Sequence, residues 1–131
     1  MIAADTSTWI AFLETERGRD TGDHDTDLLD KALQDRQVVM VPVVLAELLS
    51  DPQLPLDIAE TLVQIPAIDI APGYWQRAGA LRAKVLSRRR KARLGDALIA
   101  QCCIDAKTGL ITRDRDFRSF VDAADLDVIF P

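Results

Sequence analysis

Short apolar runs alternate along the chain with longer segments in which apolar residues recur at helical spacing. The short runs are predicted strands, and they lie at residues 1–4, 38–41, 65–70, 110–112 and 128–130. The longer segments are predicted helices, and they lie at residues 28–36, 43–50, 56–64 and 74–90, and directly after Thr8 and Gly95. Parallel strands need long crossover connections, which are usually helices. The alternation therefore predicts a three-layer α/β/α sandwich around a mostly parallel sheet of about five strands.

Residues at the ends of these segments fit the predicted boundaries. Ser7 or Thr8 is expected to cap the first helix, and Pro42 suits the first turn of the helix that follows it. Residues Gly18–Asp27 are polar and punctuated by glycine, so they are predicted to form a loop. On the helix over 74–90, the residues expected to face the core are Trp75, Ala78, Leu81, Val85 and Leu86.

The length and composition of the chain limit the classes of protein to consider. A chain of 131 residues suits one hydrophobic core, so residues 1–131 are predicted to form a single domain. Its formal net charge of -5 argues against a general nucleic-acid binder. Cys102 and Cys103, the only cysteines, are adjacent on a predicted helix, which excludes a disulfide framework. No signal-peptide pattern or membrane-spanning run is found, so we expect a cytoplasmic protein.

Four acidic residues lie at the ends of predicted strands or near the beginnings of predicted helices. Asp5 and Asp114 each follow a strand. Asp96 begins a helix, and Glu47 lies among aliphatic residues within another helix. Because the carboxyl ends of parallel strands meet at one edge of the sheet, these acids are expected to converge on one pocket. Clustered carboxylates need a counter-charge, and hard oxygen ligands select Mg²⁺ or Mn²⁺; zinc is not expected, because His24 is the only histidine.

Each of these acids also has a purely structural explanation. Asp5 can simply end a strand, and Asp96 can serve as a helix cap or a first-turn charge. Asp114 and Asp116 can belong to a solvated turn. Glu47 must either reach solvent or find a polar partner. Their joint occurrence in this order favours one shared site over separate structural roles.

The segments that carry the acids resemble those of PIN domains, and specifically of VapC-like toxin ribonucleases of bacterial toxin-antitoxin pairs. The matching segments are Asp5–Trp9 (DTSTW), Val44–Leu48 (VLAEL), Asp96–Ala100 (DALIA) and Thr112–Phe117 (TRDRDF). Each segment alone is a weak signal. Their order and spacing extend over nearly the whole chain, and this joint pattern is specific.

The resemblance implies a role for each matching side chain. The implied catalytic acids are Asp5, Glu47, Asp96 and Asp114. Of these, Glu47 is implied to be an auxiliary metal ligand, as is Asp116, and the other three are implied to bind Mg²⁺ or Mn²⁺ directly. Ser7 and Thr112 match hydroxyl positions that help to shape such sites.

The implied function is that of a metal-dependent endoribonuclease, the toxin of a toxin-antitoxin pair. Such an enzyme hydrolyses RNA phosphodiester bonds and is expected to leave 5′ phosphate and 3′ hydroxyl ends. The resemblance also implies a cognate antitoxin and a homodimer, with a larger toxin-antitoxin assembly as a further possibility.

Two other classes of function stay open at this point. One is a catalytically silent PIN-fold module that binds RNA or a partner, although the presence of all four acids argues against it. The other is a phosphoryl-transfer enzyme or receiver domain. That class needs a second acid near Asp5 in the pattern Asp-x-Asp, or a paired acid with a suitably placed lysine, and residue 7 is Ser.

A run of basic residues precedes Asp96. It contains no acid, and it comprises Arg82, Lys84, Arg88, Arg89, Arg90, Lys91 and Arg93. A helix C-terminus favours one or two cations, so part of this run can be a solvated helix end. Its size exceeds that need, and the run is therefore predicted to bind the RNA backbone, with Arg113 and Arg115 as extensions.

Overall fold

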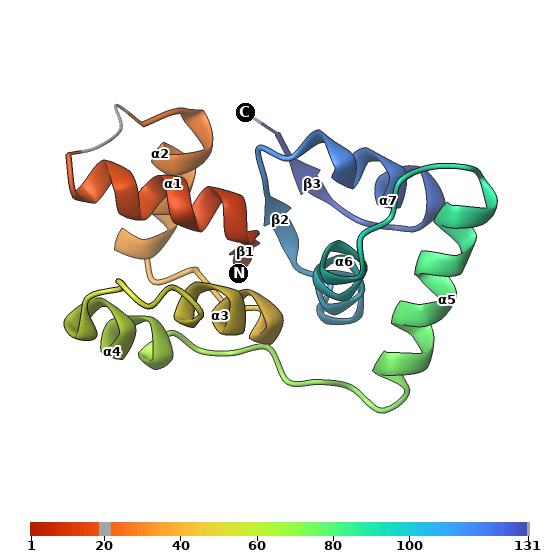
Figure 1. Ribbon diagram of the computed structural model, residues 1–131, viewed down its shortest axis with the longest axis horizontal. Helices are drawn as coiled ribbons and strands as arrows, with labels where there is room; N and C mark the ends of the chain where they lie inside the picture. The colour runs from red at the N-terminus through yellow and green to blue at the C-terminus, as the bar shows by residue number, and fades with distance from the viewer. Residues whose placement is uncertain (19–21, 131) are drawn as a thin grey trace.

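The computed structural model describes residues 1–18 and 22–130 and has short strands separated by helices (Figure 1). The strands are β1 (Ile2–Ala4), β2 (Gly109–Ile111) and β3 (Val128–Ile129). The helices are α1 (Thr6–Glu16), α2 (His24–Gln34), α3 (Pro42–Leu49), α4 (Leu56–Gln64), α5 (Tyr74–Ser87), α6 (Leu94–Ala106) and α7 (Arg118–Ala123), with a 3₁₀ turn, η1 (Arg115–Phe117), before α7. Within the described ranges, no helix has the length and apolar character needed to cross a membrane.

The three strands form a parallel sheet in the order β1-β2-β3. The pairing of β1 with β2 runs from Ile2 opposite Gly109 to Ala4 opposite Ile111. Both strands therefore end at the same edge of the sheet. The residues that follow them are brought together at that edge.

The predicted strands around Val38 and Ala67 are present only as isolated parallel bridges, one between the first segment and β1 and one between the two segments. Val38 pairs with Ile2, and Met40 pairs with Ala67. Proline shortens the strand pairing of both segments. Pro66 has no N–H to donate to a neighbouring strand, and α3 begins with a proline directly after the segment around Val38. Among the described residues, the prediction of five strands is therefore corrected to three strands, with two bridged segments on the β1 side of the sheet.

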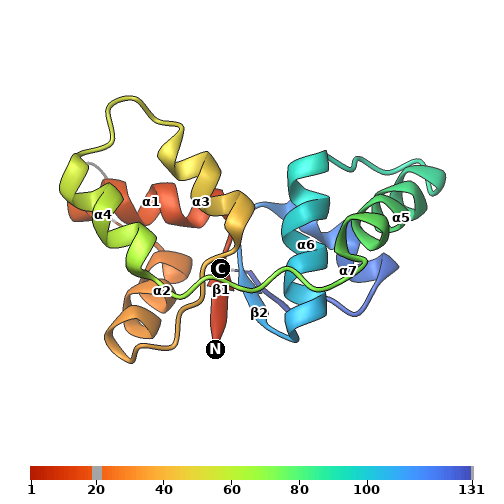
Figure 2. The ribbon, with the colours of Figure 1, turned by 90° about the horizontal axis from the view of Figure 1, so that it is seen from below.

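Helices cover both faces of the sheet (Figures 1 and 2). Helices α1, α2, α3 and α4 lie on one side, and α5, α6 and α7 lie on the other. This arrangement confirms the predicted three-layer α/β/α sandwich. The core is mainly aliphatic, and its largest fully buried side chains include Trp9, Phe117, Phe120, Leu29 and Met40.

Helix α1 begins with a different cap from the one predicted. Oδ1 of Asp5 accepts a hydrogen bond from the backbone N–H of Thr8 at 3.0 Å, so Asp5 is the N-cap rather than Ser7 or Thr8. Asp is a favoured N-cap residue because its short side chain reaches the free N–H groups of the first turn. One acid therefore ends β1 and starts α1.

The predicted loop over Gly18–Asp27 is wrong from His24 onward, where α2 begins. The backbone N–H of Asp23 donates to Oγ1 of Thr26 at 2.8 Å, which stabilises the first turn of this helix. That turn consists of polar residues and therefore has the composition of a loop. The part of the predicted loop at residues 19–21 lies outside the described residues.

Helix α5 packs along a narrower stripe than predicted. Ala78, Leu81 and Val85 are buried, as expected, but Trp75 is 66% exposed and Leu86 is 45% exposed. The buried stripe advances by three or four residues at a time. Trp75 and Leu86 each lie one position beyond a stripe residue, which turns them about 100° away from the core.

Substitutions on α5 test this orientation. Leu81→Ala is expected to lower the free energy of unfolding by about 2–5 kcal/mol, because it leaves a cavity in the core. Leu86→Ala, the matched control on the same helix, is expected to cost about 0.5 kcal/mol or less. Urea denaturation followed by circular dichroism measures both changes. Equal losses for the two variants would contradict the orientation of α5.

Candidate functional site

The four acids predicted from the sequence border one pocket. Asp5 directly follows β1, and Asp114 lies in the loop after β2. Asp96 lies in the first turn of α6, and Glu47 lies on α3. The pocket has a volume of about 230 Å³, and its other lining residues are Thr6, Ser7, Ile10, Arg93 and Ile99.

Parallel strand pairing explains why distant acids meet here. Ala4 lies opposite Ile111, and the backbone N–H of Asp5 donates to the carbonyl of Ile111 at 3.1 Å. Asp5 and Thr112 therefore leave the sheet at the same edge. Oγ1 of Thr112 donates to Oδ2 of Asp5 at 2.7 Å and accepts from the backbone N–H of Asp114 at 2.9 Å. A single hydroxyl thus links the two strand ends.

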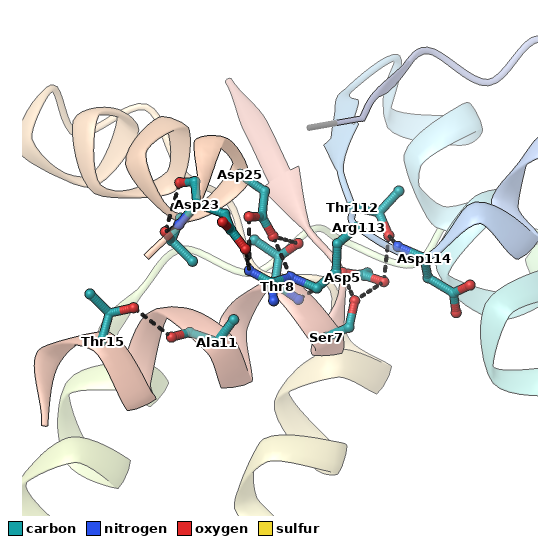
Figure 3. Close-up of polar contacts among 11 residues, drawn as sticks. Asp5, Ser7, Thr8, Ala11, Thr15, Asp23, Asp25, Thr112, Arg113 and Asp114 are labelled. Carbon is teal, nitrogen blue, oxygen red and sulfur yellow. Dashed lines mark hydrogen bonds and ion pairs between the residues drawn. The ribbon is translucent and has the colours of Figure 1, made fainter. Parts of the chain in front are cut away.

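Asp5 is a buried and well-satisfied carboxylate. It is 3% exposed, and its hydrogen-bond donors are Ser7, Thr8 and Thr112 (Figure 3). Burial raises the pKa of Asp5 above its ordinary value, while these hydrogen bonds favour the ionised form and oppose that rise. The two predicted hydroxyls, Ser7 and Thr112, both contact this carboxylate.

The environment of Asp96 differs from that of Asp5 in its hydrogen bonding. Its Oδ2 is buried and has no hydrogen-bond partner among the described residues. Burial, the largest cause, and the negative charges of Asp114, Asp5 and Asp116 together raise the pKa of Asp96 to about 6, against the opposing positive charge of Arg93. At neutral pH this side chain carries a charge that the protein itself does not compensate fully.

Asp96, Asp114 and Asp116 form the group of described acids best placed for a cation. One carboxylate oxygen from each lies within 4.8 Å of the others. Oxygen ligands of Mg²⁺ lie about 2.0–2.1 Å from the ion, so oxygens on opposite sides of it are about 4 Å apart. The group is therefore of a size that small side-chain adjustments can close around one ion. It includes Asp116, which was predicted as auxiliary, and it does not include Asp5.

Asp5 is outside this group, and its oxygens accept hydrogen bonds from within the protein. They cap α1 through Thr8 and accept the hydroxyls of Ser7 and Thr112. Asp114 is oriented differently, since its Oδ1 accepts from the backbone N–H of Asp116 at 2.9 Å. That contact folds the loop after β2 so that Asp114 and Asp116 both point toward Asp96.

Glu47 lies at the rim of the pocket on an exposed part of α3. Its Oε1 accepts a hydrogen bond from Oγ1 of Thr6 at 2.9 Å. An acid between aliphatic residues was expected either to reach solvent or to find a partner, and Glu47 does both. Thr6 holds it toward the pocket from the first turn of α1.

Several cations of the predicted basic run bind within the protein. They are Arg82, Lys84, Arg88 and Arg90. Arg82 donates to the carbonyl of Ala92 at 2.8 Å, and the other three contact the end of α7 at Asp122 and Ala123. These contacts hold the end of α5 and the chain after it against α7. They give these side chains a structural role whether or not they also bind RNA.

Other cations of the run lie nearer to the acids. Nζ of Lys91 is 3.2 Å from Oδ2 of Asp116, and Arg93 lines the pocket. Arg89 is exposed, and its backbone has φ of 58°. Arg115, which was predicted as an extension of the run, places its guanidinium over the ring of Phe130, 5.2 Å from the ring centre.

Arg113 is paired within the protein. Its Nε and Nη2 donate to the carboxylate of Asp25 at 2.8 and 2.9 Å, and Nη2 lies 3.5 Å from Asp23 (Figure 3). An RNA phosphate at Arg113 would have to compete with these acids. Sequence reasoning missed Asp25, because its partners Thr8 and Arg113 lie 17 and 88 positions away and no local pattern links them.

Solved structures with the same fold come from several bacteria. VapBC2 from Rickettsia felis, bound to a DNA fragment from their promoter, is 19% identical, with a TM-score of 0.75 over 100% of this chain and 99% of that chain. FitAcB from Neisseria gonorrhoeae is 22% identical, with a TM-score of 0.71 over 100% and 97%. VapBC-5 from Mycobacterium tuberculosis, a member of the VapBC family of toxin-antitoxin systems, is 23% identical, with a TM-score of 0.60 over 72% and 82%. No match was found among curated protein sequences.

The sequence itself matches a known family over most of its length. The match is to the PIN domain and covers residues 2–122, from β1 into α7. It includes all of the acids that border the pocket. The chain therefore belongs to the PIN domain family.

Proposed function

We propose that this PIN domain protein is a metal-dependent endoribonuclease and the toxin of a toxin-antitoxin pair. The observation that carries the proposal is the environment of Asp96. Its Oδ2 is buried without a hydrogen-bond partner among the residues described, and its carboxylate lies in one group with those of Asp114 and Asp116. A buried anionic oxygen without a partner is costly, and a divalent cation would supply the missing partner.

Membership of the PIN domain family supports nuclease activity, and the acidic pocket suits a hard cation. Mg²⁺ or Mn²⁺ held by Asp96, Asp114 and Asp116 would neutralise the cluster, activate a water molecule and stabilise the leaving 3′ oxygen. Asp5 accepts bonds from three donors, and a carboxylate has about four acceptor positions, so it can make one further contact in the pocket.

Glu47 is suited to a different task from the buried acids. It is exposed at the rim of the pocket, and Thr6 engages only its Oε1. Its second oxygen is therefore available to orient the attacking water or to accept a proton from it. In this assignment the buried acids bind the cation, and Glu47 acts on the nucleophile.

Cations beside the pocket would hold the RNA. Lys91 and Arg93 lie at the acids, and Arg89 is exposed two positions earlier. A local group of cations allows a protein of net charge -5 to bind a polyanion at one place. Arg88, Arg90 and the other cations of the run would contribute mainly by holding this segment in place.

The toxin role rests on family membership and on what is known of the similar structures. VapBC-5 belongs to a family of toxin-antitoxin systems, and another structure of this fold, 21% identical with a TM-score of 0.63, is a toxin-antitoxin complex from Klebsiella pneumoniae. We propose by analogy that this chain binds a cognate antitoxin and forms a homodimer.

RNA cleavage by the purified protein tests the enzymatic proposal. Cleavage is expected with Mg²⁺ or Mn²⁺, with 5′ phosphate ends, and it should stop when EDTA is added. Asp5→Asn and Asp96→Asn are expected to lower the rate at least about 100-fold, which exceeds the effect of most residues that only support metal ligands. Asp57→Asn, at an exposed acid on α4, is the control. If the Asp96→Asn variant cleaved RNA at the wild-type rate, the proposed site would be wrong. If the wild-type protein bound the cation but never cleaved RNA, the protein would be a catalytically silent module.

The raised pKa of Asp96 predicts how its substitution changes stability with pH. The folded-state pKa is about 6, against an ordinary value of 3.8, so the folded protein binds the proton more tightly than the unfolded chain. The carboxylate therefore destabilises the metal-free protein increasingly as the pH rises through this window, and the full cost is present above it. Asp96→Asn is expected to raise the melting temperature at pH 7.5 by about 3 °C or more, a gain that shrinks as the pH falls toward 4. Thermal scans over this pH range measure it, and a gain independent of pH would contradict the assignment.

Arg89→Asn tests the RNA contact, because asparagine tolerates the left-handed backbone at this position. RNA affinity is expected to fall. In a plot of the logarithm of RNA affinity against the logarithm of salt concentration, the slope should become shallower by about 0.7, the value for one lost phosphate contact with a single strand. Arg36→Asn is the matched control, since Arg36 is also exposed, also has positive φ (54°) and lies after α2. Titrations with the Asp96→Asn protein avoid cleavage of the RNA. Equal slopes for the two variants would exclude Arg89 from the interface.

A further inference from the structure

We propose that Asp25 is a positioning residue that holds the two walls of the acidic pocket in place through Thr8 and Arg113. This inference rests on the proposed function, because it assigns Asp25 an effect on cation binding. It concerns a residue outside the pocket itself, on the first turn of α2.

Asp25 is a fully buried acid whose two oxygens are both engaged. It is 0% exposed, and it accepts the Nε–H of Arg113 at 2.8 Å and the Nη2–H at 2.9 Å (Figure 3). Oγ1 of Thr8 donates to it at 3.0 Å. Burial acts to raise the pKa of Asp25, but the contacts with Arg113 and Thr8 outweigh it and lower the pKa below its ordinary value. Asp25 is therefore an ion throughout the neutral range.

Each partner of Asp25 is connected to an acid of the pocket. Thr8 gives its hydroxyl to Asp25 and its backbone N–H to Asp5, so one residue of α1 connects the two acids. Arg113 lies between Thr112, whose hydroxyl binds Asp5, and Asp114, one of the proposed ligands. Asp25 thus anchors both the helix turn that carries Asp5 and the strand end that carries Asp114.

The pocket needs such an anchor because its own side chains repel one another. Asp114, Asp116 and Asp96 each place one carboxylate oxygen within 4.8 Å of the others, and the repulsion between their like charges pushes the loop after β2 away from α6. The planar guanidinium of Arg113 binds both oxygens of Asp25, which fixes direction as well as distance. Buried ion pairs are poor sources of net stability and are better suited to fixing a geometry.

The chain contains a second two-point ion pair for comparison, which is more exposed than the pair of Asp25 with Arg113. Arg77 on α5 binds Asp105 on α6 through Nε and Nη2, at 3.1 and 2.5 Å, in the same two-point geometry. That pair joins two helices and has no contact with the acids of the pocket among the residues described. Asp105→Asn therefore removes the same chemical interaction without touching the proposed cation site.

The experiment measures Mn²⁺ affinity by calorimetry and melting temperature by scanning fluorimetry, in the wild type and in both variants. Asp25→Asn is expected to weaken Mn²⁺ binding about tenfold, the lower end of the effect of residues that orient metal ligands. Asp105→Asn is expected to bind Mn²⁺ within about twofold of the wild type, although both variants melt at lower temperature.

The possible results separate the two proposals. If Asp25→Asn melts lower but binds Mn²⁺ as well as the wild type, Asp25 is only a structural residue and this inference is overturned. If Asp25→Asn does not fold, the Thr8→Val variant decides, because this substitution removes one contact of Asp25 and keeps the ion pair with Arg113. Thr8→Val is expected to weaken Mn²⁺ binding. Unchanged Mn²⁺ binding by this variant overturns the inference. A wild-type protein that binds no Mn²⁺ overturns the proposed function, and the present inference with it.

Discussion

The parallel pairing of β1 with β2 holds the acidic pocket together against the mutual repulsion of its carboxylates. The pairing places Asp5 beside Ile111, and the hydroxyl of Thr112 then joins the two strand ends. Burial, together with this repulsion, raises the pKa of Asp96 to about 6. A site of this kind lowers the stability of the metal-free fold, and the burial of the aliphatic core and of aromatic side chains such as Trp9 offsets that loss.

The acids of the pocket fall into two kinds. Asp5 is enclosed and accepts hydrogen bonds from three neighbours, so it serves the fold as a helix cap while it adds negative charge to the pocket. Asp96 is enclosed and incompletely engaged, so it is the acid that gains most from a cation. The ion pair of Asp25 with Arg113 extends the scaffold behind the pocket. In the proposed site, the acids that would bind the cation are thus distinct from the acids that hold them in position.

Much of the site follows from the order of elements alone. A parallel sheet brings every residue after a strand to one edge, so the position of Asp5 relative to Asp114 required no knowledge of side-chain packing. The bounds of α4, Leu56–Gln64, were also predicted as the structure has them. Tertiary contacts decided the rest. Asp25 lies in a polar helix turn with the composition of a loop, and the exposure of Trp75 depends on which neighbours α5 packs against.

The proposed function requires a divalent cation between Asp96, Asp114 and Asp116. Crystals grown with Mn²⁺, with diffraction data collected at the manganese absorption edge, test this claim most directly. An anomalous peak is expected in contact with oxygens of all three carboxylates, including Oδ2 of Asp96. A peak elsewhere on the molecule, or none at saturating Mn²⁺, would contradict it.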